Sequence, residues 1–280
     1  MSRTRLSTVT NTWAIFQREF MALFYSPIAY VVLFLFMISN GWIFYYYCVN
    51  YARDPQQITL VIRSLFSFAF FWVLPLSPLL AMRLFSEEKR TGTIEVLMTA
   101  PVRAAEVVCG KFLATQLFYM LIWSSLLLFV LVLEVLGKPA GPDWGPVKSM
   151  YFGLFFLGCM TNSLGLLAST FSRNQLVAAV LSLSGNLLFF SLLFLGWIYR
   201  ETPELQRLFH YLSFQAHFSS EYIGGVVELR YIVFYLGFTS LFLFLSINMV
   251  NGRKWRGVHL KPTDRQSRRK RVSLSPPRMS

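Results

Sequence analysis

Three side chains that could bind a metal ion lie close together in the last third of the chain. His217 and Glu221 are four residues apart, and His210 is seven residues before His217. On one continuous helix, these spacings would place all three side chains on the same face. Two imidazoles and a carboxylate could hold zinc in a membrane-embedded, metal-dependent enzyme. The spacing does not match the H-E-x-x-H motif, so we favour the alternative: polar groups of a helix at the membrane surface, with no metal bound.

Two Gly-Lys pairs raise the question of nucleotide binding. A phosphate-binding loop has the pattern G-x-x-x-x-G-K-[ST]. Ala105 stands where the first glycine before Gly110 belongs, and Val132 stands there before Gly137. Neither segment can hold a phosphate through this loop. We therefore expect no cofactor and no catalytic residue in this chain, and any ATP and Mg²⁺ would be bound by a separate subunit.

The segment Arg83–Arg103 combines charged residues with a short apolar run. Gly92 is a natural helix end, because glycine adopts the left-handed conformation at low cost. Thr93 can cap a new helix, with Glu95 in its first turn, and Pro101 would close it. The result is a short, largely apolar helix on a charged helical extension. Two interpretations remain open: it docks against a partner protein, or it lies in the membrane interface.

The composition indicates that these segments belong to a membrane protein. Of its 280 residues, 55% are hydrophobic and 14% are charged, whereas soluble domains carry about 25% charged residues. A helix that crosses the lipid core needs about 20 predominantly apolar residues. We therefore predict an all-α polytopic membrane protein with a transmembrane domain over residues 28–250. Its six predicted transmembrane helices cover residues 28–48, 64–82, 108–135, 150–171, 176–198 and 231–250.

Three further segments flank or interrupt these spans. Residues 1–27 predict a cytoplasmic amphipathic helix, and residues 200–230 predict an outer re-entrant or interfacial segment, too short and too polar to cross. Residues 251–280 are basic and rich in Arg, Ser and Pro, which is typical of disorder. The N-terminal helix carries its aromatic residues at spacings of three and four: Trp13, Phe16, Phe20 and Phe24.

The distribution of positive charge predicts the orientation. Most of the 26 Lys and Arg residues fall in the segments that share a side with the two termini. By the positive-inside rule, both termini are cytoplasmic and the protein is a multi-pass protein of the cell inner membrane. A net charge of +13 beside hydrophobic spans indicates contact with anionic lipids and not with nucleic acid. The three cysteines, Cys48, Cys109 and Cys159, form no disulfide or metal motif.

A few polar residues fall inside the predicted spans. Such groups must face protein or a water-filled path, because lipid offers them no hydrogen bonds. They could line a translocation path or join neighbouring helices, and both interpretations remain open. The residues concerned are Asn40, Gln116, Asn162 and Asn186. The spans contain no deep pair of ionisable residues, which argues against proton or ion coupling. Pro75 and Pro78 could bend the second span.

The loop has a recognisable signature. Residues Phe85–Val102 resemble the pattern F-x-E-E-x-x-x-G-T-[IL]-E-x-L-x-T-[AS]-P-[VLI] of type-2 permeases of ABC exporters, especially the gliding-motility and copper-enzyme-maturation branch. A second match covers Leu212–Phe218 and continues through Gly224 to Glu228–Arg230. The resemblance extends over nearly the whole chain. The long arginine-rich tail is a departure from the family pattern.

This resemblance implies a permease subunit of an exporter. It implies a homodimer or heterodimer of six-span permeases with separate ATP-binding-cassette subunits, in which residues 83–103 form a cytoplasmic coupling helix and residues 1–27 a connecting helix. A passive structural component of the membrane is a further alternative. The residues that match the signature, and would couple the chain to the ATPase subunit, are Glu87, Glu88, Gly92, Thr93, Glu95, Leu97 and Pro101.

Overall fold

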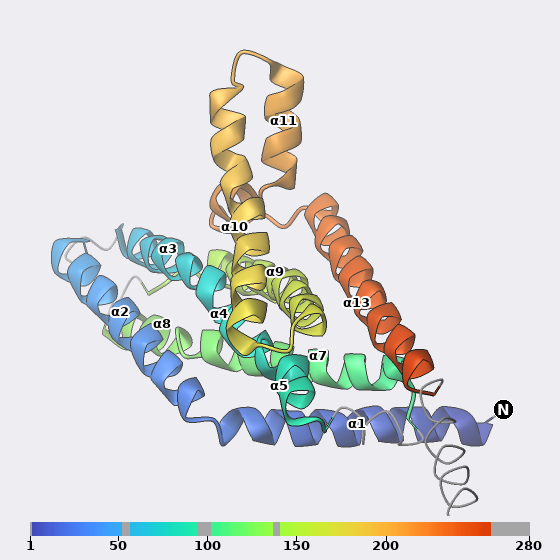
Figure 1. Cartoon of the computed structure of the whole chain (residues 1–280). Coiled ribbons are helices and arrows are strands. Elements are labelled where there is room, and N and C mark those ends of the chain that lie inside the picture. Colours follow the sequence, from blue (N-terminus) through green and yellow to red (C-terminus); the bar gives the residue numbers. More distant parts are fainter. Residues whose placement is uncertain (1, 52–56, 94–101, 137–140, 259–280) are drawn as a thin grey trace, which may run out of the picture.

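A computed structural model describes residues 2–51, 57–93, 102–136 and 141–258, and within these ranges the protein contains helices and no strands. Six of its helical segments are long and apolar enough to cross a membrane, which confirms the predicted all-α polytopic fold (Figure 1). In chain order the helices are α1 (Ser2–Phe24), α2 (Pro27–Tyr51), α3 (Ile58–Ala69), η2 (Phe70–Trp72), α4 (Val73–Ala81), α5 (Arg83–Thr91), α7 (Ala104–Ser124), α8 (Leu127–Leu136), α9 (Trp144–Phe171), α10 (Gln175–Ile198), α11 (Pro203–Leu212), α12 (Phe214–His217), η3 (Phe218–Tyr222) and α13 (Leu229–Val258).

The second span is longer than its apolar core and is not a regular helix. It runs over Ile58–Thr91. Its end lies beyond the apolar stretch, because the charged residues that follow this stretch are also helical. The 3-10 turn η2 interrupts it three residues before Pro75, which lies in the first turn of α4. Pro75 has no N–H to donate to the carbonyl of Phe71, and its ring crowds that carbonyl. The irregular turn therefore follows from the proline, and Pro78 lies inside α4.

Helix α9 is the centre of the bundle. Helices α4, α7, α10 and α13 all pack against it, and small residues allow the close approach. A Cβ atom on Gly153 would lie 2.6 Å from the Tyr222 ring, and one on Gly165 would lie 2.6 Å from the Cβ of Ala81. These contacts support helix packing by small residues, as the sequence of this span indicates.

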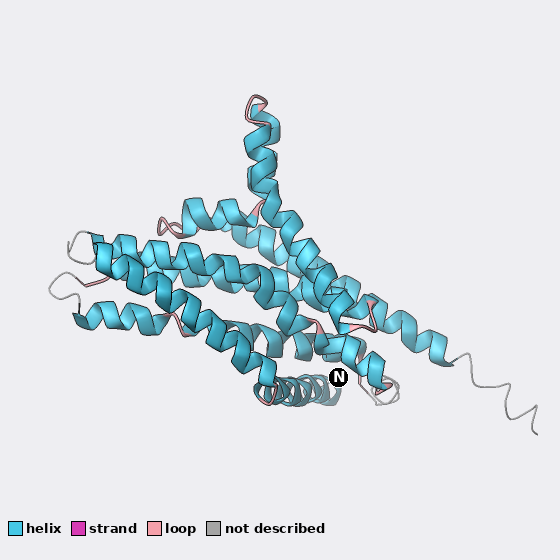
Figure 2. Ribbon diagram, turned by 60° about the vertical axis from the view of Figure 1, so that its left-hand side comes forward, coloured by secondary structure: helices cyan, strands magenta, loops and turns pink. Residues whose placement is uncertain are grey.

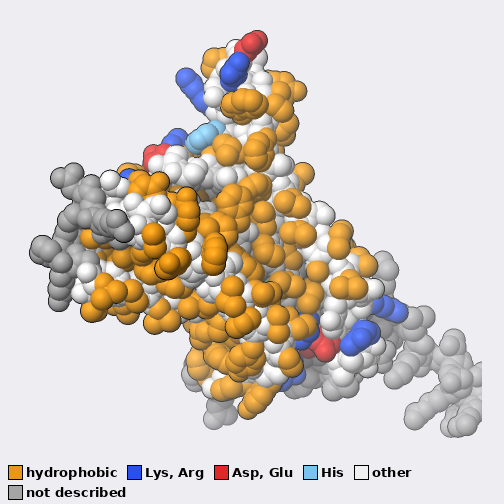
Figure 3. All heavy atoms as spheres, turned by 90° about the vertical axis from the view of Figure 1, so that its left-hand side faces the viewer, with side chains coloured by type: hydrophobic (Ala, Val, Ile, Leu, Met, Phe, Trp, Pro, Cys, Tyr) orange, Lys and Arg blue, Asp and Glu red, His pale blue; other side chains and the backbone are white. Residues whose placement is uncertain are grey.

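The two ends of the bundle are built differently. Helix α1 lies along one end, and an antiparallel pair, formed by the last turns of α10 and by α11, projects from the other (Figures 1 and 2). Apolar side chains cover much of the bundle surface in Figure 3, whereas charged groups gather on the projecting pair and towards the opposite end. We call this projecting part, the last turns of α10 together with residues 199–212, the hairpin. The apolar surface between the ends is the part that lipid or another membrane protein must cover.

Candidate functional site

The signature loop is held between two well-formed helix ends. Gly92 ends α5 in the left-handed conformation, with a φ of 76°, as the sequence predicts. At the other end, the Glu106 carboxylate accepts a hydrogen bond of 3.2 Å from the backbone N–H of Arg103 and so caps α7. Thr93 is exposed. The predicted coupling residues Glu95, Leu97 and Pro101 lie outside the described residues.

Four charged side chains form an ion-pair cluster beside this loop, which we call the charged base: Arg18, Glu19, Glu88 and Lys111. Lys111 of α7 is only 1% exposed, and its Nζ lies 3.0 Å from Oε1 of Glu19 and 2.9 Å from Oε1 of Glu88. Nη2 of Arg18 lies 2.7 Å from Oε1 of Glu19 and 3.3 Å from Oε1 of Glu88. The cluster therefore joins α1, the end of the second span and the start of the third.

The surroundings of Glu19 favour its charged form. Burial by itself would raise the pKa of Glu19, but the charge of Lys111 and hydrogen bonds from Arg18 and Lys111 outweigh burial and lower this pKa below its usual value. Two cations and two anions then compensate one another within a largely buried space. Removal of one member would leave a charge without its partner, which is costly away from water.

Helix α1 lies directly on α7 beside the charged base. A Cβ atom on Gly110 would lie 2.8 Å from Cγ2 of Ile15 and 3.0 Å from the carbonyl oxygen of Thr12. Glycine is needed here for close approach and not for an unusual backbone angle. Nδ2 of Asn11 also donates to Oε2 of Glu106 at 3.2 Å. The contact between α1 and α7 is thus specific at the level of single atoms.

The aromatic stripe of α1 is divided between protein and surroundings. The rings of Phe20 and Phe24 pack edge-on against Phe118 of α7, whereas Trp13 is 57% exposed. The amphipathic pattern therefore buries one part of the stripe on the bundle and leaves the other part free for lipid or a partner.

Lys89 connects α5 to the end of the central helix α9. Its Nζ donates to the carbonyl of Ser169 at 3.1 Å and also to that of Thr170. These carbonyls belong to the last turn of α9, where helical hydrogen bonds are missing. Neighbouring Glu87 is exposed. Of the two adjacent signature carboxylates, Glu88 thus lies within the charged base and Glu87 faces outward.

Two of the four polar residues within the spans act as packing contacts. Nδ2 of Asn162 donates to Oε1 of Gln116 at 2.9 Å, and Nε2 of Gln116 donates to the carbonyl of Phe155 at 3.0 Å. This chain of bonds joins α7 to α9. Asn40 donates to the carbonyl of Phe36 in its own helix at 2.7 Å. Asn186 is buried, and neither polar atom of its side chain has a hydrogen-bond partner among the described residues.

The predicted common face of His210, His217 and Glu221 is wrong. Ser213 is extended, with φ −87° and ψ 114°, and it separates α11 from α12. The three residues therefore do not lie on one continuous helix. His210 and Glu221 line a surface pocket, whereas His217 is fully buried.

Both ring nitrogens of His217 are already in use. Nε2 donates to the carbonyl of Tyr211 at 3.0 Å, so Nδ1 accepts from the hydroxyl of Tyr235 at 3.1 Å. Burial lowers the pKa of His217 to about 3, with a further contribution from His210 and Arg230. Among the described residues, no group of three or more His, Cys, Asp and Glu side chains is arranged to hold a metal ion. The three predicted ligands therefore do not form the metal site that a metal-dependent enzyme would need.

Sequence reasoning did not identify the charged base. Arg18 and Lys111 served only as positive charges on one side of the membrane, and Glu19 received no role. A signal was present: Lys111 follows the start of a long apolar span, and Glu19 lies within an aromatic stripe. Charged residues at such positions need partners.

The comparison with family models gives one match. Residues 13–256 match the model described as "ABC-2 family transporter protein", a range that includes the charged base and all six spans. A comparison with curated proteins finds no significant match. The matched range covers most of the 280 residues. The chain therefore belongs to the ABC-2 family of transporter proteins, as the multi-pass permease component of an ABC transporter.

Proposed function

We propose that this permease moves its substrate outward across the inner membrane, driven by ATP hydrolysis on a separate subunit. Family membership implies association with an ATP-binding subunit. In this proposal the permease works as a dimer with a second copy of itself or a related chain. The loop sequence further supports a place in the gliding-motility and copper-enzyme-maturation branch.

The charged base carries this proposal. A partner that pushes on residues 92–103 acts on α5 at one end of the loop and on α7 at the other. Lys111 and Glu88 connect these two helices to each other, at 2.9 Å, and Glu19 connects them to α1. Lys89 extends the connection to α9. Displacement of the loop would therefore move several helices as one unit, which is what coupling to an external ATPase requires.

Several segments at the α1 end support a cytoplasmic position for that end. The connection from Lys89 to α9 places the turn 172–175 beside α5, and Val250 of α13 packs in one apolar cluster with Leu84 and Val107. Helix α1 and the last turns of α13 thus lie at the same end of the bundle as α5 and the start of α7. The basic residues of the tail 251–280 would then face the anionic inner leaflet.

Glu87 offers a direct test of docking, because it is exposed and takes no part in the charged base. The chain is co-expressed with candidate ATP-binding subunits, and their recovery on the tagged permease is measured. We expect Glu87→Lys to reduce recovery, whereas Glu201→Lys on the exposed hairpin tip leaves it unchanged. The purified permease alone should hydrolyse no ATP. Robust ATPase activity of the single chain, or full recovery with Glu87→Lys, would contradict the proposal.

The charged base needs a different measurement, because its role is to transmit movement after docking. Glu19→Gln should leave recovery of the ATP-binding subunit intact. It should abolish the difference in ATPase rate between the complex and the free ATP-binding subunit. Loss of recovery together with loss of this difference would instead indicate that the base serves docking itself.

A further inference from the structure

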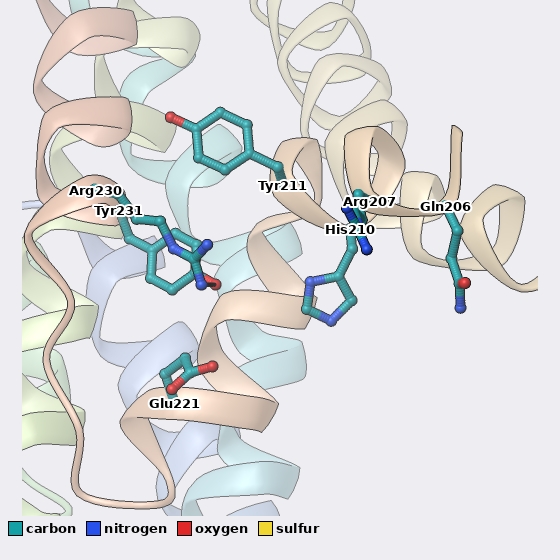
Figure 4. Close-up of a pocket in the computed structure, with 7 residues that line it drawn as sticks. All are labelled: Gln206, Arg207, His210, Tyr211, Glu221, Arg230 and Tyr231. Atoms are coloured by element: carbon teal, nitrogen blue, oxygen red, sulfur yellow. Dashed lines mark hydrogen bonds between the residues drawn. The ribbon is translucent and has the colours of Figure 1, made fainter. Parts of the chain in front are cut away.

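A polar pocket lies at the root of the hairpin, on the end of the bundle away from α1. We call it the hairpin pocket; its volume is about 570 Å³, and it is lined by Gln206, Arg207, His210, Tyr211, Glu221, Arg230 and Tyr231. Figure 4 shows that these residues come from α11, from η3 and from the start of α13. Arg230, His210 and Glu221 approach the open space from different sides.

The pocket presents both signs of charge. The guanidinium of Arg230 lies over the Tyr231 ring, 4.7 Å from its centroid, and also pairs with Glu228. Arg207 and Glu221 form no ion pair within the described part of the chain. A purely anionic ligand would meet the Glu221 carboxylate, and a purely cationic one would meet the two arginines. The arrangement is complementary to a ligand that carries a phosphate and an amine together.

A second, apolar groove lies beside the pocket along α10. Its volume is about 520 Å³, and its lining residues are Leu193, Phe194, Gly196, Trp197, Gln206 and His210. Gln206 and His210 line both spaces, so the pocket and the groove are direct neighbours. Phe194 and Trp197 are 56% and 71% exposed. A polar pocket next to an exposed apolar groove offers complementary surfaces to the two parts of an amphiphile.

The length of α10 indicates that both spaces lie near the level of the lipid headgroups. Helix α10 has 24 residues, which corresponds to about 36 Å at 1.5 Å per residue, whereas the hydrocarbon core is about 30 Å thick. Its last turns therefore reach the membrane boundary. Trp197 has the side-chain type that favours this boundary. Arg230 lies in the first turn of α13, at the same boundary.

We propose that the hairpin pocket and its groove bind a zwitterionic lipid, with the phosphate between Arg207 and Arg230, the amine at Glu221 and a chain along Phe194 and Trp197. The source of the headgroup is a membrane lipid and not a soluble phosphoamine, because an exposed apolar groove lies directly beside the pocket. This binding belongs to the permease alone and does not depend on ATP-driven transport.

Native mass spectrometry of the full-length chain, released from detergent micelles, tests the headgroup. Phosphatidylethanolamine should bind about tenfold more tightly than phosphatidylglycerol, which has no amine. Arg207→Gln should weaken both lipids about tenfold. Glu221→Gln should weaken only phosphatidylethanolamine and so remove the preference. Arg200→Gln and Glu201→Gln, exposed at the hairpin tip outside the pocket, should change neither.

The source of the headgroup is tested with soluble glycerophosphoethanolamine. Trp197→Ala should weaken binding of phosphatidylethanolamine several-fold and leave the soluble compound unaffected. Equal affinity for the soluble compound and the lipid would overturn the assignment to a lipid. Tighter binding of phosphatidylglycerol would overturn the role of Glu221. Pocket variants that bind as the tip variants do would overturn the site.

Discussion

The charged base and the hairpin pocket contain the same kinds of charged residue in opposite arrangements. At the base, Lys111 is 1% exposed and is held between two carboxylates. At the hairpin, Arg207 is exposed and forms no ion pair in the part of the chain that the structure describes. Charges satisfied within the protein hold helices together, whereas charges left open to the surroundings remain available to a ligand. The first end is suited to transmitting movement and the second to binding.

The largest expected effect comes from Lys111→Met. The carboxylates of Glu19 and Glu88 then lose their shared buried partner, so the free energy of unfolding should fall by about 3–5 kcal/mol. Arg207→Met, the matched change at the hairpin, should alter it by less than about 0.5 kcal/mol. Thermal unfolding in detergent, followed by size-exclusion chromatography, measures both.

A rescue variant checks the reason for this effect. Lys111→Met combined with Glu19→Gln and Glu88→Gln removes the unpaired charges and should recover most of the lost stability. Equal stability of the Lys111→Met and Arg207→Met proteins would remove the contrast between the two ends.

The contact of α1 with α7 gives the next effect. Gly110→Ala would place a methyl group 2.8 Å from Ile15, and the overpacking should cost about 1–3 kcal/mol. Gly237→Ala is the matched control, because nothing lies within 4 Å of its Cβ position; it should be neutral or slightly stabilising. Unfolding temperatures of the two variants provide the test, and a stable Gly110→Ala protein would mean that α1 is only loosely attached.

His217 is buried, unlike the exposed arginines that line the hairpin pocket. The pH dependence of stability should show this burial. Its pKa is lowered to about 3 in the folded protein, against about 6.5 when unfolded. Between these values the unfolded state binds the extra proton, so stability is complete above about pH 6.5 and falls by up to about 1.4 kcal/mol per pH unit below it.

Unfolding temperatures between pH 7 and pH 5 measure this slope. His217→Gln should flatten it, whereas His210→Gln, at an exposed position, should preserve it. In this interval Glu19 contributes little, because its pKa is lowered and it stays ionised. An unchanged slope in His217→Gln would assign the pH dependence to other groups.

Of the substitutions in the charged base, Arg18→Gln should have the smallest effect on stability. It tests whether exposure to solvent weakens the contribution of a charged side chain. Its side chain is 58% exposed although it belongs to the charged base. Arg18→Gln should therefore cost only about 0.2–1 kcal/mol, with less effect at high salt. A loss as large as that of Lys111→Met would mean that exposure does not decide the contribution of each charge.

The spans were predictable because each is an apolar run of sufficient length, and the six predicted transmembrane helices are present. The helix end at Gly92 was also predictable, because the left-handed conformation there favours glycine. The charged base was not, since Arg18 and Glu88 are 70 residues apart. Such pairs depend on how helices pack and not on local spacing.

The hairpin end shows a different limit. The spacing from His210 to Glu221 predicts a common face only if the helix is continuous, and the extended Ser213 breaks it. Ser213 is neither proline nor glycine, so its residue type does not predict a break in the helix. The break is accompanied by burial of Phe214 and Phe218 in the core, which a single sequence does not reveal. The predicted coupling roles of Glu95, Leu97 and Pro101 remain predictions.

Helix α5 is anchored through two consecutive residues that point to different neighbours. Glu88 reaches α7 and α1, and Lys89 reaches the end of α9. Consecutive residues on a helix are about 100° apart around its axis. Two contacts at different angles therefore fix the rotational position of α5, because rotation about the helix axis would break at least one of them. In the proposed coupling, a force from the partner on the loop would therefore act along the axis of α5, and the contacts of Glu88 and Lys89 would resist rotation about this axis.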